Sequence, residues 1–209
     1  MLQVTQVQKI YSEKTILTIP DLKIREGIYW LKGHNGSGKS TFLKIISGLI
    51  PFDGEVELLS SNLKKNGVEY RRLVSYAEAE PLYPEFLSGK DLIRFYNSIR
   101  KSNEKKSNEL LDRFGISNYY ENPIGTYSSG MAKKLSLLLA FIGETKFIFL
   151  DEPFVTLDSS TVQVLISVIK EFHSQGRSFI FTSHQSSETN ALPLTSELIA
   201  QNNSVCFQS

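Results

Sequence analysis

The sequence predicts a single α/β domain built around a mainly parallel β-sheet. Short apolar runs alternate with segments of helical periodicity, which is the order produced when helices cross between parallel strands. A glycine-rich loop, Gly33–Thr41, stands between one of these runs and a helix-like segment. The run Phe147–Leu150 has the uniformly apolar composition of a central parallel strand. These three observations define the fold class.

The N-terminal third is rich in strand patterns. Four of its segments have the residue types expected of strands, and these are Val4–Ile10, Ile16–Ile24, Ile28–Leu31 and Glu55–Leu59. After the glycine-rich loop, Thr41–Leu49 places apolar residues on one face of a helix. Gly48 and Pro51 mark the expected end of that helix.

The middle of the chain has a different character. Residues 88–120 are polar and helix-like, and the charged run Arg100–Asn108 is typical of a solvated loop or helix face. From Ser129 to Ile142 the pattern predicts a helix that is apolar on most sides. Val162–Ile169 predicts an amphipathic helix, and Ser178–Thr182 predicts the strand after it.

Composition narrows the class of protein. The 209 residues include 23 basic and 22 acidic side chains, and this net charge of +1 does not indicate a partner made of nucleic acid. The apolar runs are far shorter than the roughly 20 residues that cross a bilayer, and the N-terminus lacks the pattern of a signal peptide. Cys206 is the single cysteine, which fits a reducing compartment. We therefore expect a cytoplasmic protein that reaches a membrane only through a partner.

The glycine-rich loop has the form G-x-x-x-x-G-K-[ST], which is typical of phosphate-binding loops. Its nine residues are Gly33, His34, Asn35, Gly36, Ser37, Gly38, Lys39, Ser40 and Thr41. Gly36 and Gly38 can take backbone angles closed to other residues, so that N–H groups point at the phosphates. Lys39 is expected to reach the β- and γ-phosphates, and the Ser40 hydroxyl to bind Mg²⁺. Alone, the loop indicates a P-loop nucleotide hydrolase or kinase.

Two acids follow the apolar run Phe147–Leu150. They are Asp151 and Glu152, and Pro153 comes next. Open α/β sheets bind ligands at the carboxyl ends of their strands. Asp151 is therefore a candidate Mg²⁺ ligand, directly or through water, and Glu152 is a candidate base for an attacking water. The alternative is an acidic turn that only caps a strand.

Further segments resemble the ABC ATPase family. Tyr127-Ser128-Ser129-Gly130-Met131 is similar to the Leu-Ser-Gly-Gly-Gln signature and begins 24 residues before Asp151, which is the spacing of the family. Three residues match other motifs of the family. His184 matches the switch histidine, and Asp158 matches the loop after the acids. Tyr11, which lies 22 residues before Gly33, matches the aromatic that stacks on adenine.

The resemblance implies a P-loop NTPase fold with a RecA-like core, a β-rich edge and an ABC-type helical insert. The core would span about residues 1–76 and 135–209, and the helical subdomain about residues 77–134. It also implies that ATP and Mg²⁺ are bound between two copies or paired ATPase subunits arranged head-to-tail. Ser128, Ser129 and Gly130 of one subunit would then meet the ATP of the other. Transport would pass through a separate permease, with this subunit peripheral on the cytoplasmic face of the membrane.

The sequence departs from the family pattern at two places. In the signature, Ser129 replaces a glycine and Met131 replaces the glutamine. The glutamine of the family's Q-loop is missing from Tyr76-Ala77-Glu78-Ala79-Glu80-Pro81, where ungapped counting gives Ala79 and a slip of one residue gives Glu78 or Glu80.

Two other functions compete with a transporter ATPase. A repair or translation ATPase of the same family would need a long coiled-coil insertion or a second ATPase domain, and the sequence has neither. A P-loop kinase would not explain the signature at its spacing. The transported substrate and the direction of transport are not encoded in this chain, although its compactness and signature look like those of exporter-type subunits.

Overall fold

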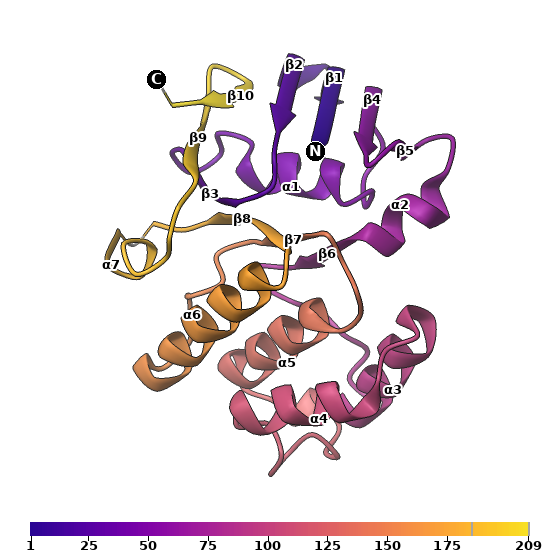
Figure 1. Ribbon diagram of the computed structural model, residues 1–209, viewed down its shortest axis with the longest axis vertical. Coiled ribbons are helices and arrows are strands. Elements are labelled where there is room, and N and C mark those ends of the chain that lie inside the picture. The colour runs from indigo at the N-terminus through magenta and orange to yellow at the C-terminus, as the bar shows by residue number, and fades with distance from the viewer. Residues whose placement is uncertain (185, 209) are drawn as a thin grey trace.

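The computed structural model describes residues 1–184 and 186–208, and its strands form two sheets (Figure 1). The smaller sheet is antiparallel, in the order β2-β1-β4-β5. Its strands are β1 (Leu2–Tyr11), β2 (Lys14–Ile24), β4 (Asp53–Leu58) and β5 (Ser61–Asn62). Alternate residues such as Leu2 and Val4 are buried, because one face of this sheet covers the core. The predicted β-rich N-terminus is confirmed.

The larger sheet has the order β10-β9-β3-β8-β7-β6. Its strands are β3 (Ile28–Lys32), β6 (Val74–Ala77), β7 (Phe147–Leu150), β8 (Ser178–Thr182), β9 (Ser196–Gln201) and β10 (Ser204–Phe207). All neighbours are parallel except β9 and β10. β7 and β8 are buried along their whole length, which explains why their sequences show no alternation.

Helix α1 (Lys39–Ile46) lies between the two sheets (Figure 1). Phe42 and Ile46 belong to one buried cluster with residues of β1 and with Phe147 of β7. The helix begins two residues before the predicted Thr41 and ends three residues before the predicted Leu49. It ends early because the chain turns at Gly48, whose φ of 72° lies in the left-handed region.

The other face of the parallel sheet is covered by α5 (Ser129–Phe141) and α6 (Ser159–Ser174), with α3 (Gly89–Arg100) and α4 (Glu104–Arg113) beyond them (Figure 1). α3 begins with a capping box between Ser88 and Asp91. The predicted solvated run, Arg100–Asn108, joins α3 to α4, and most of it is exposed. α5 ends one residue before the predicted Ile142.

Several short elements were not predicted, and these are α2 (Gly67–Leu73), η1 (Ile124–Thr126), α7 (Ser186–Thr189) and the strands β5, β6, β9 and β10. Across the described residues, no helix has the length and apolar character that crossing a membrane requires.

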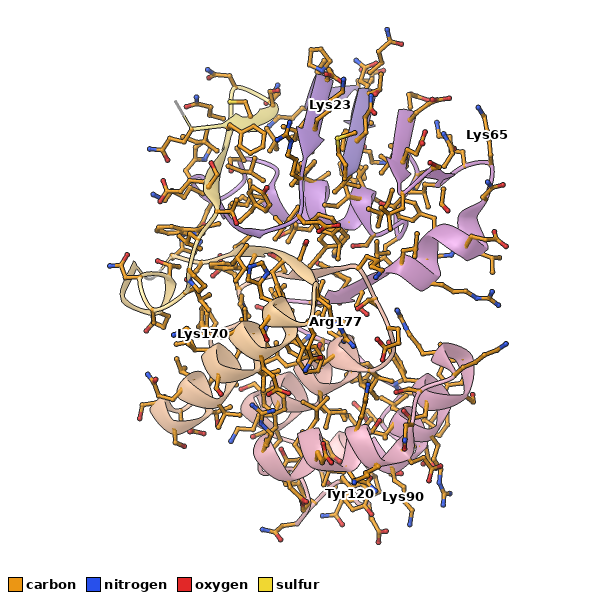
Figure 2. All side chains as sticks on the ribbon, in the orientation of Figure 1. Lys23, Lys65, Lys90, Tyr120, Lys170 and Arg177 are labelled. Carbon is orange, nitrogen blue, oxygen red and sulfur yellow. The ribbon has the colours of Figure 1, made fainter. Side chains whose placement is uncertain are left out.

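Charged side chains mostly cover the outside of the molecule, as Lys23, Lys65 and Lys90 do in Figure 2. Arg177 is different, because it is 5% exposed and lies over the ring of Phe172 at 4.3 Å. Its guanidinium donates to Glu144 Oε2 at 3.3 Å. This contact ties the end of α6 to the loop before β7.

Candidate active site

The phosphate-binding loop connects β3 to α1, as the sequence predicts. Gly33, Gly36 and Gly38 have φ values of 152°, 76° and 98°. A Cβ on Gly33 would lie 2.5 Å from Ser37 Oγ, and one on Gly38 would lie 2.9 Å from Leu17 Cδ2. Glycine is therefore required at Gly38 by both its backbone angle and the space around it.

Lys39 and the start of α1 make this loop attractive to anions. The Lys39 ammonium is buried and donates to Gly33 O at 2.8 Å and His34 O at 3.1 Å, so it lies inside the curve of the loop. Gly38 is the N-cap of α1 and provides no side-chain cap. The first N–H groups of the helix are consequently left for a ligand, and the helix dipole favours a negative one.

A cavity of about 420 Å³ opens beside the loop. Its walls include Asn35, Gly36, Gly38, Lys39, Ser40, Thr41, Tyr11, Ile16, Glu152 and His184. Tyr11 is 45% exposed, and Lys9 Nζ lies 4.4 Å from the centre of its ring. One cavity thus joins most of the predicted nucleotide-binding residues to both predicted catalytic residues.

Asp151 lies at the carboxyl end of β7 and is 3% exposed. Its Oδ1 accepts a hydrogen bond of 2.7 Å from Thr182 Oγ1, and its Oδ2 accepts one of 3.2 Å from Tyr76 OH. Burial, followed by the charge of Asp151, raises the pKa of the Tyr76 phenol, so Tyr76 remains a donor. The sequence singled out neither Thr182 nor the Tyr76 hydroxyl, because only the pairing of neighbouring strands brings them to Asp151.

Glu152 has an unusual backbone, with φ at 44°. Its N–H donates to Thr182 Oγ1 at 2.8 Å, so one threonine hydroxyl orients both acids. Its Oε1 lies 3.2 Å from His184 Nε2. The indole of Trp30 donates to Ser183 O at 3.1 Å, which fixes the backbone next to His184.

Lys133 is a third residue that sequence reasoning missed. It is 1% exposed and donates to three carbonyls, Glu78 O at 2.7 Å, Ala79 O at 3.1 Å and Asp151 O at 2.9 Å. All three N–H bonds of the ammonium are therefore used. Burial lowers the pKa of Lys133 to about 8, although nearby carboxylates such as that of Asp151 oppose this effect.

The signature residues do not line the nucleotide cavity. Ser128 caps α5 by accepting from Met131 N at 3.2 Å, and Ser128 and Ser129 are exposed. A Cβ on Gly130 would lie 2.9 Å from Thr156 O. The signature is therefore packed against the segment that follows the acids, and its two serines are exposed at the surface.

Asp158 lies next to this signature helix. It caps α6, since its Oδ1 accepts from Thr161 N at 2.8 Å, and its Oδ2 accepts from Lys134 Nζ at 2.9 Å. Hydrogen bonds from Ser160, then from Lys134, hold the pKa of Asp158 well below its usual range.

The residues present suit a Mg²⁺ ion that is bound together with a nucleotide. Ser40 and Glu152 supply oxygen atoms to the cavity, and Asp151 lies behind them. Within residues 1–184 and 186–208, no three His, Cys, Asp or Glu side chains gather into a metal site. Magnesium commonly takes one or two protein ligands and completes its shell with phosphates and water, which matches this arrangement.

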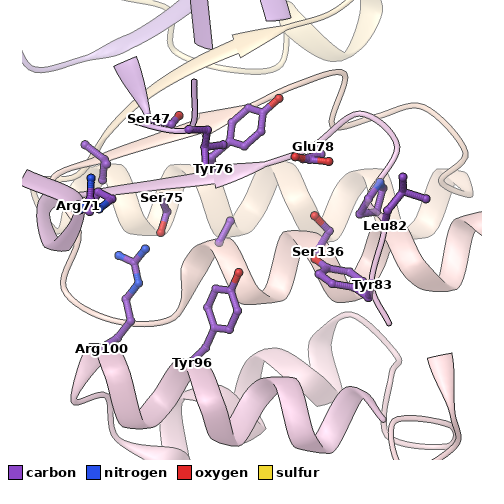
Figure 3. Close-up of a pocket in the computed structure, with 14 residues that line it drawn as sticks. Ser47, Arg71, Ser75, Tyr76, Glu78, Leu82, Tyr83, Tyr96, Arg100 and Ser136 are labelled. Atoms are coloured by element: carbon purple, nitrogen blue, oxygen red, sulfur yellow. The ribbon is translucent and has the colours of Figure 1, made fainter. Parts of the chain in front are cut away.

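The segment after β6 does not line the nucleotide cavity. Glu78 lines a second cavity (Figure 3), Ala79 is half-buried and Glu80 is exposed. None of the three is among the residues that line the nucleotide cavity.

Comparison with known proteins agrees with this geometry. The family model for the ABC transporter matches residues 17–155. The lantibiotic transport ATP-binding protein SrtF of Streptococcus pyogenes is 32% identical over 92% of this chain and 83% of its own length. The cytochrome c biogenesis ATP-binding export protein CcmA of Histophilus somni is 31% identical over 91% of this chain and 90% of its own.

Solved structures share the fold. An ATP-binding subunit of an ABC transporter superposes with a TM-score of 0.90, at 24% identity, and covers the whole chain and 90% of its own. The ATP-binding cassette MJ0796, in a dimeric post-hydrolysis state with ADP and Pi, gives a TM-score of 0.86 at 19% identity over 100% of this chain and 98% of its own.

The fold and the loop between β3 and α1 define a P-loop nucleotide-binding protein. The predicted fold class, a RecA-like core with a β-rich edge and an ABC-type helical insert, is confirmed. The chain belongs to the ABC transporter family, as one of its ATP-binding cassettes.

Proposed function

We propose that this chain hydrolyses ATP with Mg²⁺ in order to drive transport through a separate permease. Lys39 and the loop residues from Gly33 to Thr41 would hold the phosphates, and Tyr11 the adenine. Ser40 and Asp151 would bind Mg²⁺, and Glu152, oriented by His184, would accept the proton of the attacking water. The arrangement that supports these roles is the single cavity that Lys39, Glu152 and His184 share.

We also propose that hydrolysis requires a second subunit arranged head-to-tail. The observation that carries this proposal is the position of Ser128, Ser129 and Gly130. None of them lines the nucleotide cavity, and both serines are exposed. A second copy, or a paired ATPase subunit, would bring its signature to this cavity, with Asp158 near the contact. The start of α5 offers N–H groups and a positive helix end to the γ-phosphate.

The permease would contact the surface around residues 76–86, at the edge of a helical subdomain of about residues 77–134. Phe86 is 82% exposed there, whereas Tyr83 packs against the core. This contact would place the chain on the cytoplasmic face of the membrane. The named relatives act in lantibiotic transport and in export during cytochrome c biogenesis, and export is the direction that we propose.

Glu152→Gln tests the central claim. Glutamine keeps the shape of glutamate but cannot accept a proton, and losing a general base costs about 10²–10⁴-fold in rate. The variant should bind ATP–Mg²⁺ and elute at dimer mass in size-exclusion chromatography, whereas wild type, which hydrolyses ATP, elutes mainly as monomer. Hydrolysis by the variant at the wild-type rate would show that Glu152 is not the base.

A further inference from the structure

Trp30 is the single tryptophan of the chain, and it belongs to β3, which lies between β8 and β9 in the larger sheet (Figure 1). In the strand register, Trp30 is paired with Phe181 of β8 on one side and with Glu197 of β9 on the other. Paired residues of neighbouring strands share one face of a sheet. The indole therefore lies on the face that α5 and α6 cover, where it packs against the buried cluster that contains Phe181.

The indole reaches the peptide group that precedes His184. Its Nε1–H donates to Ser183 O at 3.1 Å. β8 ends at Thr182, so Ser183 and His184 follow the strand and are not part of it. A peptide group is planar, and the one that carries the Ser183 carbonyl also carries the amide nitrogen of His184. Holding this oxygen therefore restricts the direction in which the His184 side chain leaves the backbone.

A neighbouring ion pair restricts the indole in turn. Lys32 is two residues further along β3, on the same face of the sheet as Trp30. Its Nζ lies 4.1 Å from the centre of the indole ring and 2.6 Å from Glu197 Oε2. An ammonium over the face of an indole attracts the ring, and here the carboxylate keeps the ammonium in place. The indole N–H is thus presented to Ser183 from a braced side chain.

The contact between His184 and Glu152 depends on such a brace. The His184 side chain is 51% exposed, and its Nε2 lies 3.2 Å from Glu152 Oε1. A hydrogen bond weakens steeply when its length or angle departs from the best geometry, so both backbones must be held. On the Glu152 side, the backbone N–H donates to Thr182 Oγ1 at 2.8 Å. On the His184 side, Trp30 supplies the corresponding restraint.

We propose that Trp30 is a positioning residue for ATP hydrolysis, whose indole N–H holds the Ser183 carbonyl so that His184 stays within reach of Glu152. This inference rests on the proposed function, in which His184 orients the base Glu152. Trp30 does not line the nucleotide cavity, so it acts on the chemical step and not on the affinity for nucleotide. The indole N–H should accordingly affect kcat and leave KM for ATP unchanged.

The test exchanges the indole nitrogen. Because Trp30 is the only tryptophan, expression in a tryptophan auxotroph supplied with benzothienylalanine puts sulfur in place of the N–H at this position alone and keeps the size of the ring. We expect kcat to fall about three- to tenfold with KM unchanged, which is the factor that one ordinary hydrogen bond gives. Fluorotryptophan, which keeps the N–H, is the matched control and should restore kcat.

A double-mutant cycle with His184→Ala separates positioning from a general loss of structure. If Trp30 acts through His184, benzothienylalanine should lower kcat in the wild-type sequence but not the residual kcat of His184→Ala. An equal fold-loss in both sequences, or a full kcat for the labelled wild-type sequence, would overturn the inference and leave the proposed function standing. If the wild-type protein hydrolyses no ATP, the proposed function fails, and this inference with it.

Discussion

Replacing Lys133 by methionine should destabilise the chain, because three backbone carbonyls lose the hydrogen bonds that they accept from the Lys133 ammonium. The substitution keeps length and bulk but loses the bonds to Glu78 O, Ala79 O and Asp151 O. Each bond from a charged donor is worth about 1.5–3 kcal/mol. The variant also avoids the cost of burying a charged ammonium, which the lowered pKa of about 8 puts at about 3 kcal/mol. This gain offsets part of the loss from the hydrogen bonds. For three such bonds, the net loss in the free energy of unfolding is therefore about 1.5–6 kcal/mol.

Urea unfolding without nucleotide measures this loss, and Lys134→Met is the matched control. Lys134 is the next residue of the same helix, and its ammonium pairs at the surface with Asp158 at 2.9 Å. Such surface pairs contribute about 0–1 kcal/mol. Equal losses for the two variants, or a gain in stability for Lys133→Met, would refute the reasoning that the carbonyls depend on Lys133.

Three further changes test separate parts of the site. Lys39→Ala should weaken ATP binding by about a hundredfold while the circular dichroism spectrum is unchanged; wild-type affinity in a nucleotide titration would contradict the role of the loop. Thr182→Val removes the hydroxyl that orients Asp151 and Glu152, so kcat should fall by about 10–100-fold with little change in KM, and Thr182→Ser should restore it. For Asp158, the lowered pKa means that its contribution to stability is complete above about pH 5 and is lost gradually as the pH falls below about 4 toward the lower pKa of the folded protein. The stability difference between wild type and Asp158→Asn should accordingly stay constant from pH 7 to 5 in urea unfolding and shrink gradually in acid; a difference at pH 2 as large as that at pH 7 would count against it.

The local motifs of this chain could be predicted from sequence because the chemistry fixes their residue types. The loop from Gly33 to Thr41 needs glycine where φ is positive, and the apolar run before Asp151 needs burial on both faces. Both constraints act within a few neighbouring residues. The sequence alone was therefore sufficient to place the loop, the acids and most of the strands and helices.

The contacts that orient the acids could not be predicted in the same way. Tyr76, Lys133 and Thr182 lie 75, 18 and 31 residues from Asp151. They meet it through strand register, such as Leu150 beside Phe181, and through the packing of α5 on β6. The strands β9 and β10, at one end of the larger sheet, were missed for a related reason, since the pairing of β9 with β3 and of β10 with β9 decides their conformation more than their own residues do.

The position of Tyr76 has a thermodynamic consequence. Tyr76 is one of the residues that line the second cavity, and its hydroxyl donates to the carboxylate proposed to bind Mg²⁺. If a ligand in that cavity shifts Tyr76 and changes the affinity for Mg²⁺ by some factor, Mg²⁺ must change the affinity for that ligand by the same factor. Binding of Mg²⁺ would then affect a ligand in that cavity as strongly as the ligand affects the binding of Mg²⁺. Tyr76→Phe would weaken both effects equally.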